Sequence, residues 1–336
     1  MSGDKRKELI ENIEKKRKSR VVAFVTGDKP NFGTKIADDA VPFFYKILKE
    51  IGKVEKLDIF LYSRGGNIVT PWRLINLLRE YSDNLSVLIP FRAHSATTLM
   101  ALGANEIIMG PLGELSPIDP SITTPFNPRS DLSKNQPIPI SVEDIINYFD
   151  FAREELNIVE PSNLVELYKI LVEKVDPIAL GRVYRVYIQI RGLASRLMEL
   201  SKYNDVKIKD NIIDLLTKKL YSHDYIVARR EAENYGLKIV HAESKDACEI
   251  EDLMWDLYSE YAKKLEMDKP LNPKEKIEVN VDEKSFILKR AVIESRNMEY
   301  SFNSNIKITK IKKGSQLTYN ISVDDLGWEF IDERSV

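Results

Sequence analysis

Short apolar runs alternate with amphipathic segments along the first 110 residues of the chain. The amphipathic segments 38–51, 70–81 and 95–103 repeat apolar residues at helical spacing. The runs between them are rich in Val, Ile and Leu without polar alternation, as in strands buried on both faces of a sheet. These runs span residues 20–26, 57–63, 85–90 and 105–110. Such alternation predicts an α/β fold with a mainly parallel sheet and right-handed crossovers.

The pattern changes beyond residue 110. Six prolines fall between Pro117 and Pro139; they exclude a continuous helix or a central strand and predict a long extended segment beside the core. Helical spacing then returns in four long segments, which span residues 141–156, 161–175, 176–201 and 210–220. A short α/β piece at 230–243 and a helix from 246 to about 267 follow.

Period-two alternation replaces helical spacing past Pro270. Asn, Ser and Gly interrupt it, as in a small antiparallel sheet. We therefore predict three parts: a charged, solvated N-terminal helix at 1–19, a catalytic domain at 20–267 and a separate β-rich C-terminal module at 268–336. The module would serve binding or assembly.

Composition narrows the class of protein. Lys and Arg number 50 against 52 Asp and Glu, a net charge of −2, so nothing favours a nucleic-acid partner, whose binding relies on positive charge. The single cysteine, Cys248, allows neither an internal disulfide nor a thiolate metal cluster and indicates a reducing compartment. No apolar run reaches the roughly 18 residues of a membrane-spanning helix. We expect a soluble cytoplasmic protein without metal or cofactor.

Candidate chemistry lies at Ser95, which comes soon after an apolar run and begins a helical segment. Gly65 and Gly66 follow the preceding strand, and α/β sheets bind ligands beyond the carboxyl ends of their strands. Backbone N–H groups of this glycine pair and of Ala96, at the start of a helix, would face an oxygen that gains negative charge. A hydroxyl nucleophile between such donors is the arrangement that acyl transfer requires.

Each of these features also has an ordinary structural interpretation. A Gly-Gly pair after a strand is most often a turn, and a serine before a helix is most often an N-cap. Their joint occurrence on adjacent α/β units is more specific than either alone. Neither G-x-G-x-x-G nor G-x-x-x-x-G-K occurs, which excludes a dinucleotide fingerprint and a phosphate loop.

Three segments carry a resemblance to a known family: FLYSRGGNIVTPWRLINLLR, AHSATTLMALGANEIIMGPLGELSPIDPSI and LYSHDYIVARREAENYGLKIV. They resemble the serine dehydrogenase proteinase family, which shares the Clp/crotonase fold with Clp peptidases and signal peptide peptidases. The resemblance extends over about residues 20–245 and leaves out the N-terminal helix and the chain beyond about 268. It implies a Clp/crotonase-like parallel-sheet core with long helices, beside the small β-rich C-terminal unit.

The resemblance implies a Ser-His-Asp triad with Ser95 as the nucleophile, Asp119 as the acid and His223 as the base. A serine hydroxyl needs an imidazole to take its proton, and a carboxylate fixes the tautomer of that ring. Relatives usually place a glycine soon after the nucleophile, whereas Ala96 is followed here by two threonines. A lysine base, as in signal peptide peptidases, would fall on Lys134 and ranks below the histidine.

Few alternative bases exist, because the chain has only three histidines. His94 is adjacent to Ser95, and adjacent side chains of a helix or strand point apart, which makes it a poor base. His241 follows a strand-like run and is interpreted as a strand-end or surface residue. Asp224 is the rival of Asp119 as the orienting carboxylate, although adjacent residues rarely form the side-on bond to an imidazole.

We expect an ATP-independent serine endopeptidase that acts on peptide or protein substrates, bound as an added strand. A homo-oligomer is expected, with the helices of 141–220 as assembly surface. One alternative is a catalytically silent scaffold of the same fold that recruits partners through its C-terminal module. A crotonase-type acyl-CoA enzyme ranks third, because it shares the oxyanion geometry but does not require this serine.

Overall fold

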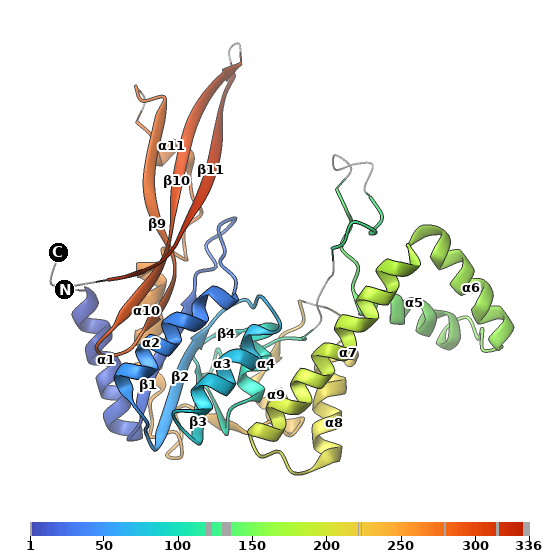
Figure 1. Cartoon of the computed structure of the whole chain (residues 1–336), viewed down its shortest axis with the longest axis horizontal. Helices are drawn as coiled ribbons and strands as arrows, with labels where there is room; N and C mark the ends of the chain where they lie inside the picture. Colours follow the sequence, from blue (N-terminus) through green and yellow to red (C-terminus); the bar gives the residue numbers. More distant parts are fainter. Residues whose placement is uncertain are drawn as a thin grey trace.

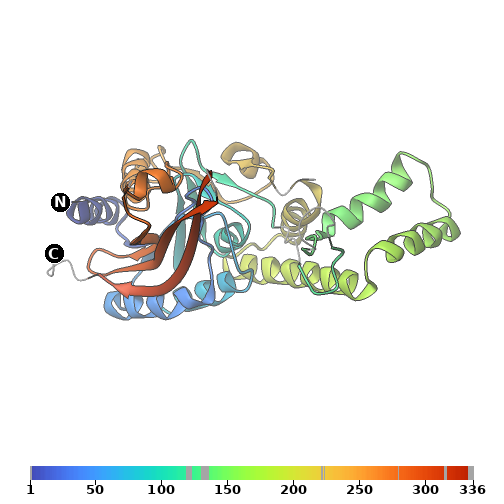
Figure 2. The same cartoon turned by 90° about the horizontal axis from the view of Figure 1, so that it is seen from above.

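The structure is a computed structural model. It describes residues 2–118, 123–129, 136–220, 222, 224–278, 280–313 and 316–331. Figure 1 shows an α/β body from which two long elements project, an antiparallel sheet of the C-terminal strands and an arm of helices. Figure 2 shows the same body from above, with the arm extending to one side.

An eight-stranded sheet forms the centre, in the order β11-β10-β9-β1-β2-β3-β5-β8. Five of its strands run parallel: β1 (Arg20–Thr26), β2 (Lys56–Tyr62), β3 (Asn84–Ile89), β5 (Glu106–Met109) and β8 (Ile239–His241). In β1, β2 and β3, every residue after the first is buried. The apolar runs without polar alternation are therefore strands covered on both faces, as predicted.

Helices cover both faces of this sheet. On one face lie α2 (Val41–Ile51), α3 (Thr70–Arg79) and α4 (Ala96–Leu102). On the other lie α1 (Ser2–Arg17) and α10 (Glu251–Lys264). Successive strand residues point to alternate faces, so each helical layer closes its own apolar core. The predicted α/β fold with a mainly parallel sheet is confirmed.

Helix α1 corrects the prediction of a solvated N-terminal helix. Its residues Leu9, Ile10 and Ile13 are buried, and Arg6 and Arg17 are only 1% and 3% exposed. These five positions form one stripe along the helix. Because two of them are arginines, the stripe does not stand out as apolar in the sequence. Both guanidinium groups are paired with buried carboxylates, which makes their burial tolerable.

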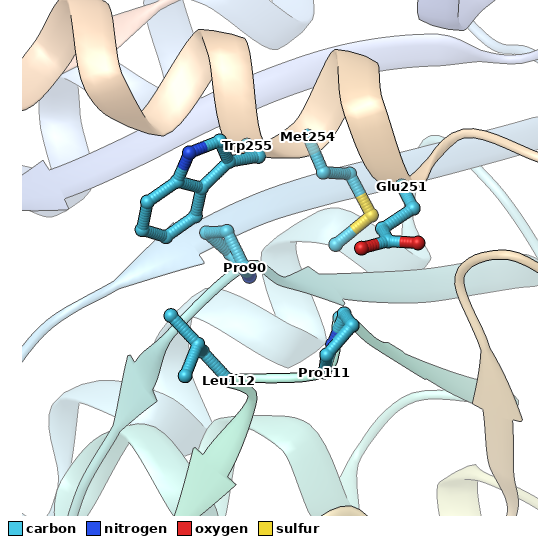
Figure 3. A pocket seen from close by; sticks show the side chains of 7 residues that line it. Pro90, Pro111, Leu112, Glu251, Met254 and Trp255 are labelled. Atoms are coloured by element: carbon cyan, nitrogen blue, oxygen red, sulfur yellow. The ribbon is translucent and has the colours of Figure 1, made fainter.

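A small apolar pocket opens between α10 and the turn after β5. Its volume is about 220 Å³, and its lining consists of Pro90, Gly110, Pro111, Leu112, Glu251, Met254 and Trp255 (Figure 3). Glu251 is the only ionisable residue of this lining. The pocket therefore offers an apolar contact surface and not a set of groups for acid–base chemistry.

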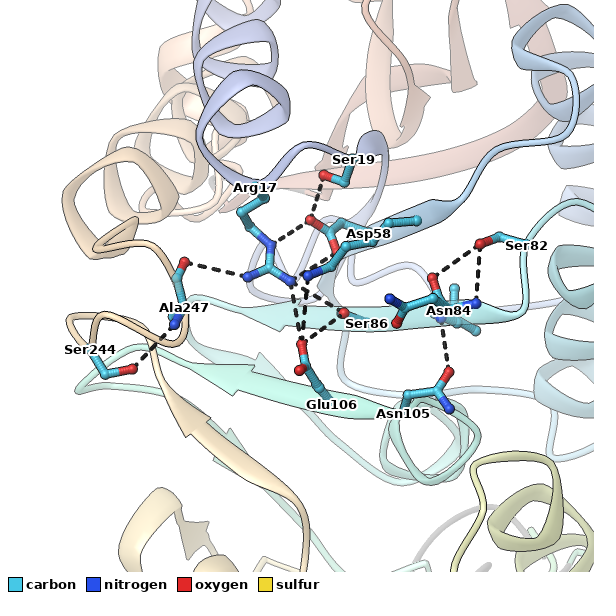
Figure 4. Close-up of polar contacts among 12 residues, drawn as sticks. Arg17, Ser19, Asp58, Ser82, Asn84, Ser86, Asn105, Glu106, Ser244 and Ala247 are labelled. Carbon is cyan, nitrogen blue, oxygen red and sulfur yellow. Dashed lines mark hydrogen bonds and ion pairs between the residues drawn. The ribbon is translucent and has the colours of Figure 1, made fainter.

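The buried end of α1 is fixed by a polar cluster on the sheet (Figure 4). Arg17 Nε donates to Asp58 Oδ2 at 2.5 Å, and its Nη2 donates to Asp58 Oδ1 at 3.2 Å and to Ser86 Oγ at 3.3 Å. Ser19 Oγ donates to the same carboxylate at 2.7 Å. Burial alone would lower the pKa of Arg17, but the hydrogen bond and charge of Asp58 raise it. The cluster ties α1 to β2 and β3.

The β-rich C-terminal unit is present, but it continues the central sheet. Its strands are β9 (Glu283–Glu294), β10 (Glu299–Lys313) and β11 (Gln316–Phe330), joined in antiparallel order. β9 also pairs antiparallel with β1, and its residues Ala291, Val292 and Ile293 are fully buried. The predicted separate sheet is therefore corrected, since alternation identifies strands but not their partners. Division of the chain at residue 268 into an independent unit stays a prediction.

The predicted long helices form the arm and its base. They are α5 (Val142–Glu154), α6 (Pro161–Lys174), α7 (Pro177–Leu200) and α8 (Val206–Asp214), which continues as the π-helix η2 (Leu215–Lys219). Short helices complete the fold: η1 (Asp38–Ala40), α9 (Arg229–Asn234) and α11 (Pro273–Lys276). The second half of α7 packs against α3 and α4, so the arm is anchored on the body.

Candidate active site

A second, small sheet brings together three distant parts of the chain. Its order is β4-β6-β7, with β4 (Arg92–Ala93), β6 (Glu114–Leu115) and β7 (Val227–Ala228). β4 and β6 run parallel, whereas β7 runs antiparallel to β6. The segments just after β4, just after β6 and just before β7 therefore lie at one end of this sheet.

Ser95 lies at that end, in the sharp turn between β4 and α4. Its backbone has φ 52° and ψ −114°, a combination that costs a residue other than glycine about 1–3 kcal/mol. Ser95 is the N-cap residue of α4, but its side chain makes no capping hydrogen bond to the helix, so helix capping does not explain this serine. A strained strand-to-helix turn that presents a serine hydroxyl is typical of nucleophiles.

Gly65 packs directly against this turn. Its φ is +99°, and a Cβ there would lie 2.8 Å from Ser95 Cβ and 2.9 Å from the His94 carbonyl oxygen. Gly66, with φ +157°, would place a Cβ inside the backbone of Ile36. Both glycines are therefore required by close backbone approach.

The two glycines differ in the hydrogen bonds that they make. The Gly65 N–H already donates to Ser63 Oγ at 3.1 Å, and its carbonyl accepts from the Ile36 N–H at 2.8 Å. In the described part of the chain, no hydrogen-bond acceptor is found for the Gly66 N–H. The Ala96 N–H, in the first turn of α4, has no acceptor within its helix. The N–H groups of Gly66 and Ala96 are thus available to a ligand, whereas that of Gly65 is already engaged.

Two hydroxyl groups that sequence reasoning missed brace the turn. Ser116 Oγ accepts from the Ser95 N–H at 2.8 Å. Thr98 Oγ1 donates to the Ala93 carbonyl at 2.8 Å and accepts from the Ser116 N–H at 3.1 Å. These bonds tie α4 to the segments after β4 and β6, and they supply the restraint that holds Ser95 in its strained conformation.

A polar cavity of about 450 Å³ opens beside this turn. Its lining residues come from the segment after β2, from β4 and β6 with the residues that follow them, and from the segment before β7: Arg64, Arg92, His94, Glu114, Ser116, Asp224, Tyr225 and Ile226. His94 and Ser116 connect the cavity to Ser95, by sequence and by hydrogen bond respectively. The cavity therefore adjoins the turn that carries Ser95, although Ser95 itself is not among its lining residues.

An imidazole–carboxylate pair lines the cavity. His94 Nε2 lies 3.0 Å from Glu114 Oε1, which also accepts from Arg92 Nε at 3.2 Å. Burial raises the pKa of Glu114, and the charge of Arg92 opposes that shift. Arg92 also donates to Asp28 at 2.7 Å. Neither Glu114 nor Arg92 belongs to a recognisable sequence motif. They lie together because β4 pairs with β6.

The predicted acid Asp119 and base His223 lie outside the described residues, as does Lys134. The structure does describe residues next to the first two, among them Ile118 before Asp119 and Asp224 after His223. The Ile118 N–H donates to the Leu216 carbonyl of η2 at 2.7 Å, and Asp224 lines the polar cavity. Among the described residues, no group of three or more His, Cys, Asp or Glu is arranged to hold a metal ion.

One known family matches the N-terminal part of the chain. Residues 2–132 match the family described as ClpP-like SDH-type serine proteinase, and this confirms the resemblance over that part of the chain. The match takes in the N-terminal helix, which the sequence prediction wrongly left out. Within the described residues, no helix is both long enough and apolar enough to cross a bilayer.

Two similar curated proteins come from Methanocaldococcus jannaschii, and both are named as uncharacterized. MJ0137 is 22% identical over 195 residues, which are 58% of this chain and 57% of that protein. MJ1495 is 24% identical over 247 residues, which are 70% of this chain and 71% of that protein. The chain thus spans little more than half the length of the first relative.

Similar solved structures include two proteases. A mutant of the membrane-bound stomatin-specific protease 1510-N has a TM-score of 0.39 and 15% identity, over 68% of this chain and 81% of its own. A mutant of ClpP1 from Listeria monocytogenes has a TM-score of 0.35 and 14% identity, over 71% of this chain and 99% of its own.

Proposed function

We propose that the protein is an ATP-independent serine endopeptidase with Ser95 as its nucleophile. The observation that carries the proposal is the conformation of Ser95: φ 52° in a non-glycine residue, without a capping bond, at the edge of a polar cavity. Strain of this kind persists only where surrounding contacts impose it, and it is concentrated at active sites.

The reaction follows from these groups. Ser95 Oγ attacks the carbonyl carbon of the scissile peptide bond and gives its proton to an imidazole. The carbonyl oxygen becomes negative and accepts hydrogen bonds from the N–H groups of Gly66 and Ala96. The carbon–nitrogen bond then breaks, the imidazolium protonates the leaving amine, and water hydrolyses the acyl-enzyme ester. No nucleotide takes part in these steps.

We propose His223 as the base and Asp119 as the acid that orients it. The register of the small sheet supports this assignment, because the segments after β6 and before β7 approach the Ser95 end of β4. The pair of His94 and Glu114 is the rival, since it already joins an imidazole to a carboxylate in the cavity. His94 adjoins the nucleophile in sequence, so we rank it second.

We propose that copies of the chain assemble through the arm. Nine large apolar side chains of the arm are at least 46% exposed: Phe151, Leu156, Val159, Val165, Tyr168, Ile170, Ile178, Tyr184 and Ile188. Helix α6 has no buried residue at all, although half-apolar helices of its length are marginal alone. Charge also favours self-association. Helix α5 contains four acidic residues and one arginine, whereas helix α7 contains four arginines and one glutamate.

A fluorophosphonate probe tests the proposed chemistry. Wild-type protein should be labelled at one serine, and Ser95→Ala should lose labelling and at least about 10³-fold of peptide hydrolysis while keeping its fold. Hydrolysis should rise with pH through the imidazole range near ~6.5. Loss of that limb in His223→Ala but not in His94→Ala supports the proposed base, and the reverse result supports its rival.

Absence of labelling in folded wild-type protein would contradict the peptidase. Two alternatives would then remain: a catalytically silent scaffold that recruits partners, and a crotonase-type acyl-CoA enzyme that uses the same N–H donors without the serine. Binding of an acyl-CoA to the purified protein separates these two.

A further inference from the structure

Arg64 is an ionic group of the cavity that the catalytic scheme does not use. It lies between Ser63 and Gly65, the residue that packs on Ser95. The Ser63 N–H donates to the Arg92 carbonyl at 2.9 Å, and the Ser63 carbonyl accepts from the His94 N–H at 3.0 Å. The backbone that carries Arg64 is therefore fixed against the nucleophile turn.

The Arg64 guanidinium lines the cavity and is exposed. In the described ranges of the chain, no carboxylate lies within 4.0 Å of it, and no hydrogen bond of its side chain is found. Arg92, the other arginine of the cavity, differs in this respect, since it is paired with both Asp28 and Glu114. Arg64 is thus a cation held at the cavity without a carboxylate partner of its own.

The other charged groups of the cavity leave this cation available. Glu114 is hydrogen-bonded to Arg92 and His94, and the charge of Arg64 also acts on it, although the two are too far apart for an ion pair. Asp224 is exposed, and the structure gives no ion pair between it and an arginine of the cavity. A substrate carboxylate in this cavity would therefore lie closer to Arg64 than any described carboxylate of the chain does.

We infer that Arg64 binds a carboxylate of the peptide substrate and makes the enzyme selective for acidic peptides. This inference rests on the proposed function. A guanidinium presents donors in a planar fork that matches a carboxylate, and such charge-assisted pairs are stronger than neutral hydrogen bonds. The carboxylate is either an Asp or Glu side chain near the scissile bond or the free terminus of a short peptide.

Three matched fluorogenic peptides identify the source of the carboxylate. The first carries Glu and an amidated terminus, the second carries Gln and an amidated terminus, and the third carries Gln and a free terminal carboxylate. Wild-type protein should favour the first or the third over the second, chiefly through KM. Equal KM values for all three would overturn the inference.

Variants of Arg64 test the residue itself. Arg64→Gln should raise KM about tenfold for the preferred acidic peptide and leave that of the neutral peptide unchanged. Arg64→Glu should favour a Lys-containing peptide instead. Arg185→Gln, at an exposed arginine of α7, is the matched control and should change neither value. An equal effect of Arg64→Gln on acidic and neutral peptides would also overturn the inference.

The proposed function and this inference fail separately. If Ser95 is labelled in wild type and in Arg64→Gln but the acidic preference is missing, only the inference is wrong. If wild type is not labelled, the carboxylate site can still be tested by binding. Fluorescence anisotropy then measures the affinity of the same peptides for wild type and for Arg64→Gln. Tighter binding of the acidic peptide that Arg64→Gln abolishes supports a carboxylate site, and equal binding overturns it.

Discussion

The turn around Ser95 and the helical arm differ in how far the rest of the chain covers them. At the turn, Ser116, Thr98 and Gly65 contact Ser95 or its helix, and each backbone position is fixed by neighbours. Helix α6 of the arm, in contrast, buries none of its residues. A segment held by several surrounding contacts can store strain, whereas a large exposed apolar surface marks an interaction site. Substitutions should therefore act through fit at the turn and through assembly at the arm.

The largest effect is expected from Gly65→Ala. The new Cβ meets Ser95 Cβ and a backbone oxygen at less than 3 Å, and the φ of +99° is unfavourable for alanine. We expect a loss of roughly 2–4 kcal/mol of unfolding free energy, together with loss of fluorophosphonate labelling. Urea denaturation and the labelling assay measure the two effects.

Gly181→Ala is the control in the arm. A Cβ at Gly181 of α7 meets nothing within 4 Å, so alanine should stabilise the helix by about 0.5–1 kcal/mol. Labelling of Ser95 should stay unchanged. If both substitutions have the same effect on stability, the contrast between the turn and the arm is wrong.

A smaller effect on stability, but a large one on assembly, is expected from charges on α6. Val165 and Ile170 are 53% and 54% exposed, so Val165→Glu with Ile170→Glu should change monomer stability by no more than about 0.5 kcal/mol per site. Sedimentation velocity should show a smaller species than wild type, because a carboxylate buried in an apolar interface is costly.

Leu326→Glu provides the matched control for the arm experiment. Leu326 is 46% exposed on β11, outside the arm. Its substitution should leave the sedimentation coefficient unchanged. A wild-type protein that sediments as a monomer, or an equal effect of Leu326→Glu, would contradict assembly through the arm.

The sequence predicted the parts of the fold in which local pattern and burial agree. The strands β1, β2, β3 and β5 lie within one residue of their predicted bounds, for example β2 at Lys56–Tyr62 against 57–63. The pattern failed where a buried position carries a charge or where the partner of a strand is remote. Arg6 and Arg17 hid the buried stripe of α1, and nothing in the alternation of β9 shows that it pairs with β1.

The candidate site likewise contains residues with a local sequence signal and residues that only remote strand pairing brings together. Ser95, Gly65 and Gly66 were found from sequence because small residues after strands are a visible signal. Glu114, Ser116 and Arg92 were not found, because they meet only through β4, β6 and β7, each two residues long. Two residues are too few to form a periodic pattern.

The last comparison is between two substitutions at Ser95 itself. Ser95→Ala keeps a Cβ and hence the strain of φ 52° and ψ −114°, whereas Ser95→Gly relieves it. Glycine adds entropy to the unfolded chain, which offsets part of the gain. Since the serine makes no capping bond, neither change removes one. We expect Ser95→Gly to be more stable than Ser95→Ala by about 1 kcal/mol in urea denaturation, with both unlabelled by the probe. A less stable Ser95→Gly would show that the turn is not strained, and the main argument for Ser95 as a nucleophile would lose its physical basis.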